Sequence, residues 1–170
     1  ETPWGNQLYR SAISHFKKIF DFRPGTVVSD LHPGYYTTMF ADELSQQGIT
    51  HMKVQHHHAH IAANLEEHNV NQPVIGIAYD GTGYGTDGTL WGSEFLIADK
   101  KNYTRAAHFE NFPLPGGESA IRDVWKIGLS LLRSAFGDDR DIYTSMGQRN
   151  MVLEILEHNI NSPLTCSIGR

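Results

Sequence analysis

The chain has 170 residues, of which 39 % are hydrophobic, and this is sufficient for one hydrophobic core of an ordinary globular domain. Its net charge of −5 without a basic run argues against a nucleic-acid surface, but allows a small anionic ligand bound by backbone amides. No apolar run approaches the roughly 20 residues that span a bilayer, so no membrane partner is expected. One cysteine, Cys166, excludes an internal disulfide and fits a cytoplasmic protein.

An amphipathic helix is predicted over the first 20 residues, ending before Pro24, because apolar side chains recur there at helical spacing. We expect this stripe to face the core; it consists of Trp4, Leu8, Ala12, Phe16 and Ile19. A buried strand is predicted at 25–31, followed by a Pro-Gly turn. Asp30 and His32 then lie at the carboxyl end of a strand, where they line a site or form an ordinary surface pair.

A second helix is expected after this turn, with Thr37 or Thr38 as its cap and Gly48 at its end. Residues 49–55 alternate as a short strand, and a further helix begins near His56. These elements form a β-α-β-α unit, so its two strands should pair in parallel.

Four of the ten histidines open that helix, at His56, His57, His58 and His60. Residues four apart on a helix lie on one face with Cβ atoms about 5–6 Å apart, so His56 and His60 can share a divalent metal. His57 and His58 point elsewhere. A polar helix start or an affinity tag is the alternative, but a tag is terminal and uninterrupted, whereas apolar structure flanks this run. Two ligands do not complete a site, so a carboxylate or tyrosine is required from elsewhere.

Further along, residues 73–80 read as a buried strand that ends at Asp80, and 81–88 as a glycine-rich turn. Strands at 89–98 and 103–109 follow after short connections, which predicts an antiparallel meander.

The turn after Asp80 carries chemistry of its own, because glycines can present successive N–H groups to phosphate oxygens. We interpret it as a nucleotide- or phosphate-binding loop formed by Gly81, Thr82, Gly83 and Gly85, with the Asp80 carboxylate available to a metal. The alternative is a plain hairpin connection. The sequence is neither a P-loop nor a dinucleotide-binding fingerprint, because no Gly-Lys-Ser/Thr follows and the next element is a strand.

A second glycine loop, with Gly116 and Gly117, leads into a helix predicted to run from Ile121 to Leu132. Its amides can bind an anion, or Glu118 can serve as the helix-dipole partner instead. Arg122 can reach an anionic ligand or belong to a solvated face. A last helix is expected at 146–159, with Val152, Ile155 and Leu156 facing inward.

Five ordered motifs together resemble the C-terminal region of the HypF-type hydrogenase-maturation carbamoyltransferases, over roughly residues 10–170. The motifs read Asp-Leu-His-Pro at 30–33, Val-Gln-His-His-His-Ala-His at 54–60, Tyr-Asp-Gly-Thr-Gly-Tyr-Gly at 79–85, Leu-Trp-Gly-Ser-Glu-Phe at 90–95 and Leu-Pro-Gly-Gly at 114–117. The resemblance implies an α/β, actin/Hsp70/sugar-kinase-like fold. Residues 1–170 are then expected to be a single partial domain, a piece of a larger protein with a mixed sheet and flanking helices.

The resemblance also implies an activity for the parent protein. Relatives of this type use carbamoyl phosphate and ATP, and form carbamoyl-adenylate. They then transfer the carbamoyl group to the C-terminal cysteine thiol of the partner HypE, for the cyanide ligand of [NiFe] hydrogenase. No catalytic residue is assigned in this chain, because the acceptor thiol belongs to the partner and no histidine lies near Cys166 in sequence.

For the site, the resemblance implies that His56 and His60 bind zinc or iron, with Asp80 at the strand-tip position beside the metal. A further aspartate normally follows a Gly-Arg-Leu-Phe-Asp motif, and this chain stops at Gly169-Arg170. We therefore expect the fragment alone to be catalytically silent, and an exposed apolar face would favour its pairing with a second copy. The alternatives are an O-carbamoyl or threonylcarbamoyl transferase acting on a small molecule or tRNA, and a non-catalytic metal- or nucleotide-binding module.

Overall fold

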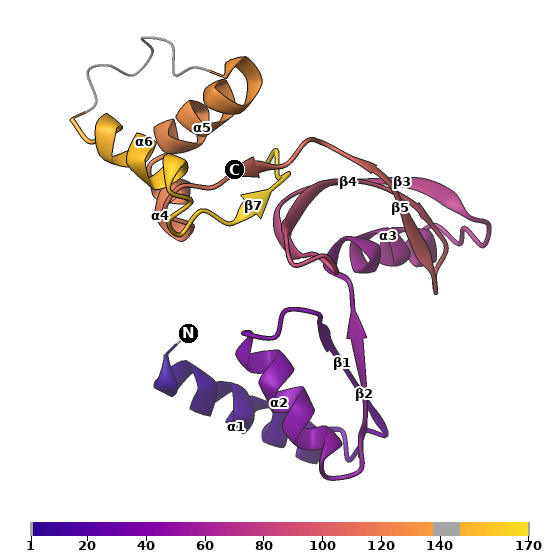
Figure 1. The fold of residues 1–170 in the computed structure, drawn as a ribbon. Coiled ribbons are helices and arrows are strands. Elements are labelled where there is room, and N and C mark those ends of the chain that lie inside the picture. The colour runs from indigo at the N-terminus through magenta and orange to yellow at the C-terminus, as the bar shows by residue number, and fades with distance from the viewer. Residues whose placement is uncertain (1, 138–146, 170) are drawn as a thin grey trace. The chain divides into compact units, whose positions relative to one another are not determined.

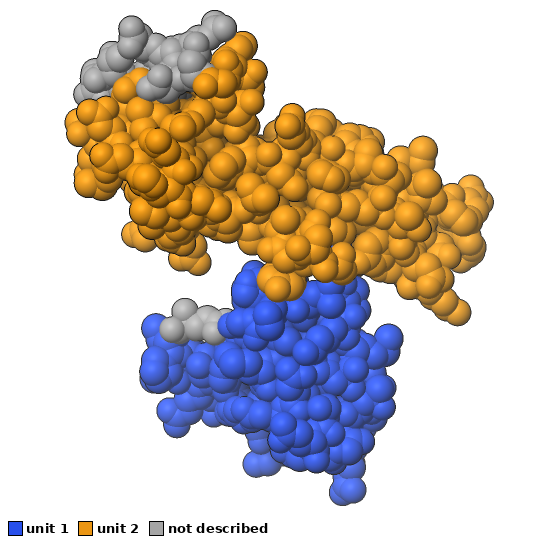
Figure 2. All heavy atoms as spheres, in the orientation of Figure 1, with its two compact units in different colours: residues 1–55 blue, residues 56–170 orange. Residues whose placement is uncertain are grey.

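The computed structural model describes residues 2–137 and 147–169. The chain forms two compact units, Glu1–Gln55 and His56–Arg170, here called unit 1 and unit 2 (Figure 2). The expectation of one partial domain over residues 1–170 stays a prediction, because two compact units can belong to one domain. Within the described ranges, no helix has both the length and the apolarity needed to cross a membrane.

Unit 1 contains two helices and a two-stranded sheet (Figure 1). Its elements are α1 (Pro3–Ile19), β1 (Thr26–Asp30), α2 (Tyr36–Ser45) and β2 (Thr50–Val54). The strands pair in parallel, with Thr26 opposite Thr50 and Asp30 opposite Val54, and α2 connects them and packs against both. The expected parallel β-α-β unit is therefore confirmed.

Helix α1 begins as its sequence predicts, with Pro3 at its first position and the Thr2 hydroxyl accepting a hydrogen bond from the Gly5 N–H at 3.1 Å. The expected orientation of its apolar stripe is wrong. Trp4 is 72 % exposed and Phe16 51 %, while Tyr9, on another face, packs edge-to-face against Phe40 of α2. A two-stranded sheet with one other helix offers too little apolar surface to cover the whole stripe.

The predicted threonine cap of α2 is also wrong. The helix begins at Tyr36, one residue before Thr37, and no side chain caps it. Thr38 is fully buried, and its hydroxyl donates instead to the carbonyl oxygen of Asp30 at 3.2 Å. This bond ties the first turn of α2 to the end of β1. The helix ends at Ser45, three residues before Gly48.

Unit 2 is organised around an antiparallel meander of β3 (Val74–Tyr84), β4 (Leu90–Ala98) and β5 (Tyr103–His108). Helix α3 (His56–Glu67) lies across one face of the meander (Figure 1). Both the meander and a helix that begins at His56 were predicted, and both are confirmed.

The core between α3 and the meander is built from small and branched side chains. It comprises Ile61, Leu65, Ala78, Leu96 and Ala98. Gly76 of β3 allows the close approach, because a Cβ atom there would lie 2.2 Å from the Cδ1 atom of Ile61. Position 76 therefore sets how closely the helix can lie on the strand.

Two strands that were expected to be buried are buried on one face at most. On β3, Gly76 and Ala78 are buried, whereas Ile75 and Ile77 between them are exposed. On β1, Val28 is 60 % exposed. A continuous apolar run does not by itself distinguish a strand covered on both faces from one covered on a single face. Strand β3 is also longer than predicted, because residues 81–84 of the expected turn belong to it.

The remaining elements of unit 2 are β6 (Phe112–Pro113), α4 (Glu118–Arg122), α5 (Trp125–Phe136), α6 (Arg149–Glu157) and β7 (Leu164–Thr165). A second, smaller core lies among them, built from Phe112, Leu114, Ala120 and Ile127. The sheet order is β3-β4-β7-β6, with β5 also paired to β4, so it is a mixed sheet: β7 joins β4 in parallel at Leu90 and Thr165. The α/β fold with a mixed sheet and flanking helices agrees with the expected class.

One predicted helix is broken into two. Residues 123 and 124 separate α4 from α5, so Arg122 and Lys126 do not lie on one continuous helix. The Lys126 ammonium instead forms an ion pair with Asp123 at 2.8 Å. The last predicted helix is confirmed from Arg149 to Glu157, with Val152 buried; Met146, its expected first residue, lies outside the described residues.

Neighbouring side chains on β4 provide a test of this packing. Leu96 is fully buried against α3, so Leu96→Ala should lower the free energy of unfolding by about 3 kcal/mol. Ile97 is 52 % exposed, so Ile97→Ala should cost about 0.5 kcal/mol. Urea unfolding followed by circular dichroism measures both. If both variants lost the same free energy of unfolding, α3 would not cover the face of β4 that carries Leu96.

Candidate metal centre

Three metal-ligating side chains converge where α3 begins beside β3. His56 and His60 come from consecutive turns of α3, and their Nε2 atoms lie 3.2 Å apart. Asp80 comes from β3, and its Oδ2 atom lies 2.8 Å from Nε2 of His56. One ligand atom from each of the three residues lies within 4.8 Å of the others. The sequence paired the two histidines from their spacing, and the fold brings in a carboxylate as the third donor.

The other two histidines of the run point elsewhere, as predicted, and the structure shows that both are turned into the protein. His57 is fully buried, with its ring centroid 6.3 Å from that of Trp91. His58 bonds to the carbonyl oxygen of Asp99 at 2.8 Å, and its ring packs against Tyr103. These two side chains hold α3 on the sheet, while His56 and His60, one turn apart, are left accessible to solvent.

The donor set fits a borderline divalent cation. Two imidazole nitrogens and a carboxylate oxygen are a ligand combination that catalytic zinc sites use, with a further position left for water or substrate. Iron(II) accepts the same donors. The side chains of His56 and Asp80 are each about one-third exposed, and a cavity of about 620 Å³ extends from His60 and Asp80 along α3 and β3. A cation and a substrate can therefore reach these atoms.

Asp80 is held in its charged form. Partial burial alone would raise the pKa of its carboxyl, but a hydrogen bond from the Gly81 N–H and the neighbouring His56 imidazole bring the pKa below its usual value. His57 is also buried, and its burial is the main reason why the pKa of its imidazole is lowered. At neutral pH the site thus offers an ionised carboxylate next to imidazole nitrogens.

The shared orientation of Asp80 and Gly83 depends on an irregularity in the β3–β4 ladder, although Asp80 by itself keeps the alternation of Gly76 and Ala78 towards α3. Tyr79 is opposite Ser93 and Gly83 is opposite Trp91, so residues 80–82 together face the single residue Gly92. Such a bulge shifts the alternation of side chains along a strand. Asp80 and Gly83, three residues apart, consequently both face the start of α3. A Cβ atom on Gly83 would lie 2.5 Å from Cε1 of His57 and 3.0 Å from Cβ of His56.

The predicted phosphate-binding glycines fall into two separate places. Gly81, Thr82 and Gly83 belong to the bulged end of β3, beside the metal ligands, and Gly85 opens the turn with its N–H donating to Thr89 at 2.9 Å. Gly116 and Gly117 adopt positive φ before the five-residue α4. Their N–H groups donate to the carbonyl oxygens of Asn161 and Leu114, with which an anion would have to compete. A phosphate role for either loop stays a prediction.

Asp30 and His32 belong to unit 1, at the end of β1, as expected from the sequence. The His32 N–H donates to Oδ1 of Asp30 at 2.8 Å, and the His32 ring stacks on Tyr35 with centroids 4.1 Å apart. Arg122 is exposed at the end of α4. The proposed site-lining role of these three residues stays a prediction.

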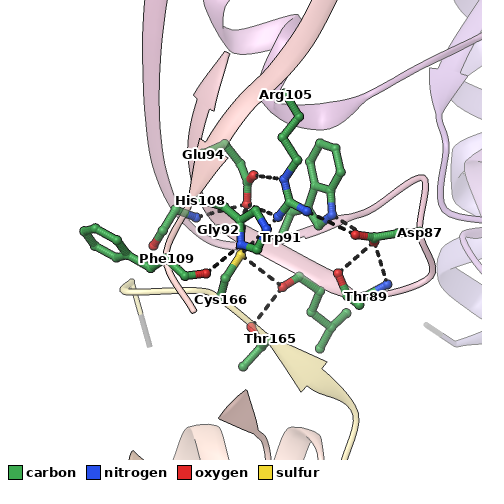
Figure 3. Close-up of polar contacts among 12 residues, drawn as sticks. Asp87, Thr89, Trp91, Gly92, Glu94, Arg105, His108, Phe109, Thr165 and Cys166 are labelled. Atoms are coloured by element: carbon green, nitrogen blue, oxygen red, sulfur yellow. Dashed lines mark hydrogen bonds and ion pairs between the residues drawn. The ribbon is translucent and has the colours of Figure 1, made fainter. Parts of the chain in front are cut away.

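Sequence reasoning missed a buried ionic network on β4 and β5, beside the site (Figure 3). Glu94 of β4 is fully buried and forms a two-point hydrogen-bonded pair with Arg105 of β5, at 2.6 and 3.2 Å. The Arg105 guanidinium also lies over the Trp91 ring at 3.9 Å and bonds to Asp87 at 3.0 Å. A glutamate in phase with Leu96 and Ala98 on the inward side of β4 was the available signal, because a buried charge requires a partner.

The second role of Glu94 is to hold the C-terminal segment of the described chain. Its Oε1 atom accepts hydrogen bonds from the Cys166 thiol at 3.0 Å and from the Gly92 N–H at 3.1 Å. Burial and this bond raise the pKa of the Cys166 thiol, which fits a structural rather than a nucleophilic cysteine. Burial opposes ionisation of Glu94 as well, but the Arg105 hydrogen bonds bring the pKa of that carboxyl below 4.5.

This network predicts a specific acid response. Because the pKa of Glu94 is lower in the folded chain than in the unfolded one, its carboxylate stabilises the fold above pH 4.5, and this contribution is lost as the pH falls through the folded pKa. Glu94→Gln should therefore be less stable than the wild type at about pH 7 and lose less stability between about pH 5 and pH 3. Urea unfolding at each pH measures this.

The control for this experiment is Glu66→Gln, since the Glu66 side chain is 74 % exposed in its ion pair with Lys100. Glu66→Gln should follow the wild-type pH profile. An unchanged profile for Glu94→Gln as well would contradict the assignment of a charged, buried Glu94.

Comparison with known proteins identifies the class to which this fold and site belong. Residues 76–170 match the family described as carbamoyltransferase, Kae1-like domain, second subdomain, and residues 2–67 match the HypF Kae1-like domain. The matched ranges include the histidine pair in one family and Asp80 in the other.

Individual relatives agree with this class. Carbamoyltransferase HypF2 of Cupriavidus necator is 40 % identical over 163 residues, covering 94 % of this chain and 20 % of the relative. Carbamoyltransferase HypF of Synechocystis is 38 % identical over 184 residues, covering 96 % of this chain and 24 % of the relative. The chain belongs to the HypF family of carbamoyltransferases. It spans only about a fifth to a quarter of the length of these two relatives.

Solved structures show the same fold. The crystal structure of full-length HypF in the phosphate- and nucleotide-bound form is 39 % identical, with a TM-score of 0.86 over 95 % of this chain and 21 % of that one. The crystal structure of T. kodakarensis HypF is 34 % identical, with a TM-score of 0.77 over 94 % of this chain and 23 % of that one. The expected actin/Hsp70-like fold class is thereby confirmed.

Proposed function

We propose that this chain is the metal-binding part of a cytoplasmic carbamoyltransferase that acts in hydrogenase maturation. The observation that carries the proposal is the convergence of His56, His60 and Asp80 in a domain of the HypF family. The proposed parent protein uses carbamoyl phosphate and ATP to form carbamoyl-adenylate. It then carbamoylates the C-terminal cysteine thiol of a HypE-type partner, as a step towards the cyanide ligand of the hydrogenase.

The cation of this site would be zinc or iron(II), held by Nε2 of His56, Nε2 of His60 and a carboxylate oxygen of Asp80. When bound, such a cation supplies Lewis acidity for a carbonyl oxygen that becomes negatively charged. The chain's own contribution is to present an ionised carboxylate and two imidazoles at the mouth of the cavity along α3 and β3.

The proposed transfer needs little covalent chemistry from this chain. In the step, the thiol sulfur of the partner's cysteine bonds to the carbamoyl carbon, the bond from that carbon to the AMP phosphate oxygen breaks, and the thiol proton is released. The products are a thiocarbamate and AMP. No nucleophile is required from this chain, which is consistent with a buried Cys166 whose thiol bonds to Glu94.

The leaving phosphate would be bound by backbone amides near the metal ligands. Gly81, Thr82 and Gly83 adjoin Asp80 on the bulged end of β3, where a phosphate would compete with the Asp80 carboxylate for the Gly81 N–H. Support comes from the relative whose crystal structure is phosphate- and nucleotide-bound and whose fold matches this chain.

A transfer assay with a matched histidine control tests the proposal. In the intact carbamoyltransferase, His56→Ala combined with His60→Ala should abolish labelling of the acceptor cysteine from radiolabelled carbamoyl phosphate and ATP, because two of the three metal donors are lost. His15→Ala removes an exposed histidine on α1, which does not line this cavity, and should retain wild-type labelling. Mass spectrometry of the partner's C-terminal peptide locates the added group.

The molecule that becomes labelled distinguishes the proposed function from its alternatives. Labelling of a small hydroxyl compound or of tRNA in place of the protein thiol would reassign the substrate. Full labelling of the thiol by the double variant would contradict the metal role of the two histidines. Metal uptake by the intact protein without any transfer would favour a binding module over an enzyme.

A further inference from the structure

We propose that Ser167 is a positioning residue for Asp80, because its hydroxyl holds the β3 bulge from which the Asp80 carboxylate extends to His56. The inference rests on the metal site proposed above and deepens it. Ser167 follows β7, far from Asp80 in sequence, and is only 3 % exposed.

The bulge creates the need for such a residue. Where residues 80–82 oppose Gly92 alone, the regular β3–β4 pairing is interrupted, and backbone groups there need partners outside the ladder. The Ser167 Oγ atom lies 2.6 Å from the carbonyl oxygen of Asp80 and 2.9 Å from that of Gly81. Its single proton is therefore shared between the two consecutive carbonyls at the residue that carries the metal-ligating carboxylate.

The backbone around this contact leaves no room for larger residues. A Cβ atom on Gly92 would lie 2.5 Å from both the Asp80 carbonyl oxygen and the Ser167 Oγ atom. A Cβ atom on Gly169 would lie 2.7 Å from the Asp80 carbonyl carbon. Two glycines thus allow the segment that carries Ser167 to lie directly on the bulge.

Ser167 is itself held on both sides by bonds to β4. Before it, the Cys166 N–H donates to the Leu90 carbonyl oxygen at 3.2 Å, and the Cys166 thiol donates to Glu94. After it, the Ile168 N–H donates to the Ser93 hydroxyl at 3.0 Å. The buried Glu94–Arg105 pair of Figure 3 therefore supports the segment that holds the bulge.

Hydrogen bonds to metal-ligating side chains fix their orientation, and loss of one typically weakens metal binding about 10- to 100-fold. Ser167 acts one step further back, on the backbone of Asp80, so Ser167→Ala should lower the affinity of the full chain for Co²⁺ by about tenfold, at the lower end of that range. It should also shift the visible absorption bands of bound Co²⁺, because the position of the Asp80 oxygen changes. Ser167→Thr keeps the hydroxyl and should bind Co²⁺ within about threefold of wild type.

The matched control is Ser130→Ala. Ser130 is 1 % exposed, and its hydroxyl also donates to a backbone carbonyl, that of Pro113, but on α5 away from β3. Both alanine variants should lose thermal stability, whereas only Ser167→Ala should change Co²⁺ affinity and spectrum. The inference would be overturned if Ser167→Ala and Ser130→Ala had the same Co²⁺ affinity and spectrum. It would also be overturned if Ser167→Thr lost as much Co²⁺ affinity as Ser167→Ala.

Two further variants separate the inference from the site on which it rests. If the wild type takes up no Co²⁺, or the double variant of His56→Ala and His60→Ala binds it equally well, the proposed metal site is itself wrong and the inference falls with it. If Ser167→Ala does not fold by circular dichroism, Ser167→Val decides, since it has the shape of Ser167→Thr without the hydroxyl; equal Co²⁺ affinity for these two variants would overturn the inference.

Discussion

The interruption of pairing between β3 and β4 is the feature on which the candidate site depends. Without the bulge at residues 80–82, Asp80 and Gly83 would lie on opposite faces of the strand. Regular alternation with Ala78 directs Asp80 towards α3, where its carboxylate lies 2.8 Å from His56. The bulge then turns Gly83 to the same side, where it leaves space for the His57 ring and lets the start of α3 lie close to that carboxylate.

A buried charge on the neighbouring strand β4 stabilises this arrangement. Glu94 is costly to bury, and it is retained where Arg105, Cys166 and two backbone amides satisfy its oxygens. The same carboxylate thereby links β4 and β5 to the segment that contacts the bulge. The metal site and the ionic network beside it are thus parts of one structure, and a change at Arg105 is expected to reach Asp80 through Ser167.

Much of this could be predicted from the sequence, because the relevant patterns are local. Helical spacing paired His56 with His60. The short connections between consecutive strands predicted the meander, and the strand-helix-strand order predicted the parallel β1–β2 pair. The rest depends on distant contacts. Neither the continuation of β3 into its glycines nor the pairing of Glu94 with Arg105 is visible in a local pattern, and the exposed stripe of α1 reflects how little apolar surface unit 1 offers it.

Anomalous diffraction from crystals of this chain grown with Zn²⁺ tests the central claim most directly. The account predicts a single strong peak about 2.0–2.2 Å from Nε2 of His56, Nε2 of His60 and an oxygen of Asp80. A peak bound elsewhere, or an electron density map in which the two rings diverge and Asp80 turns away from them, would contradict it.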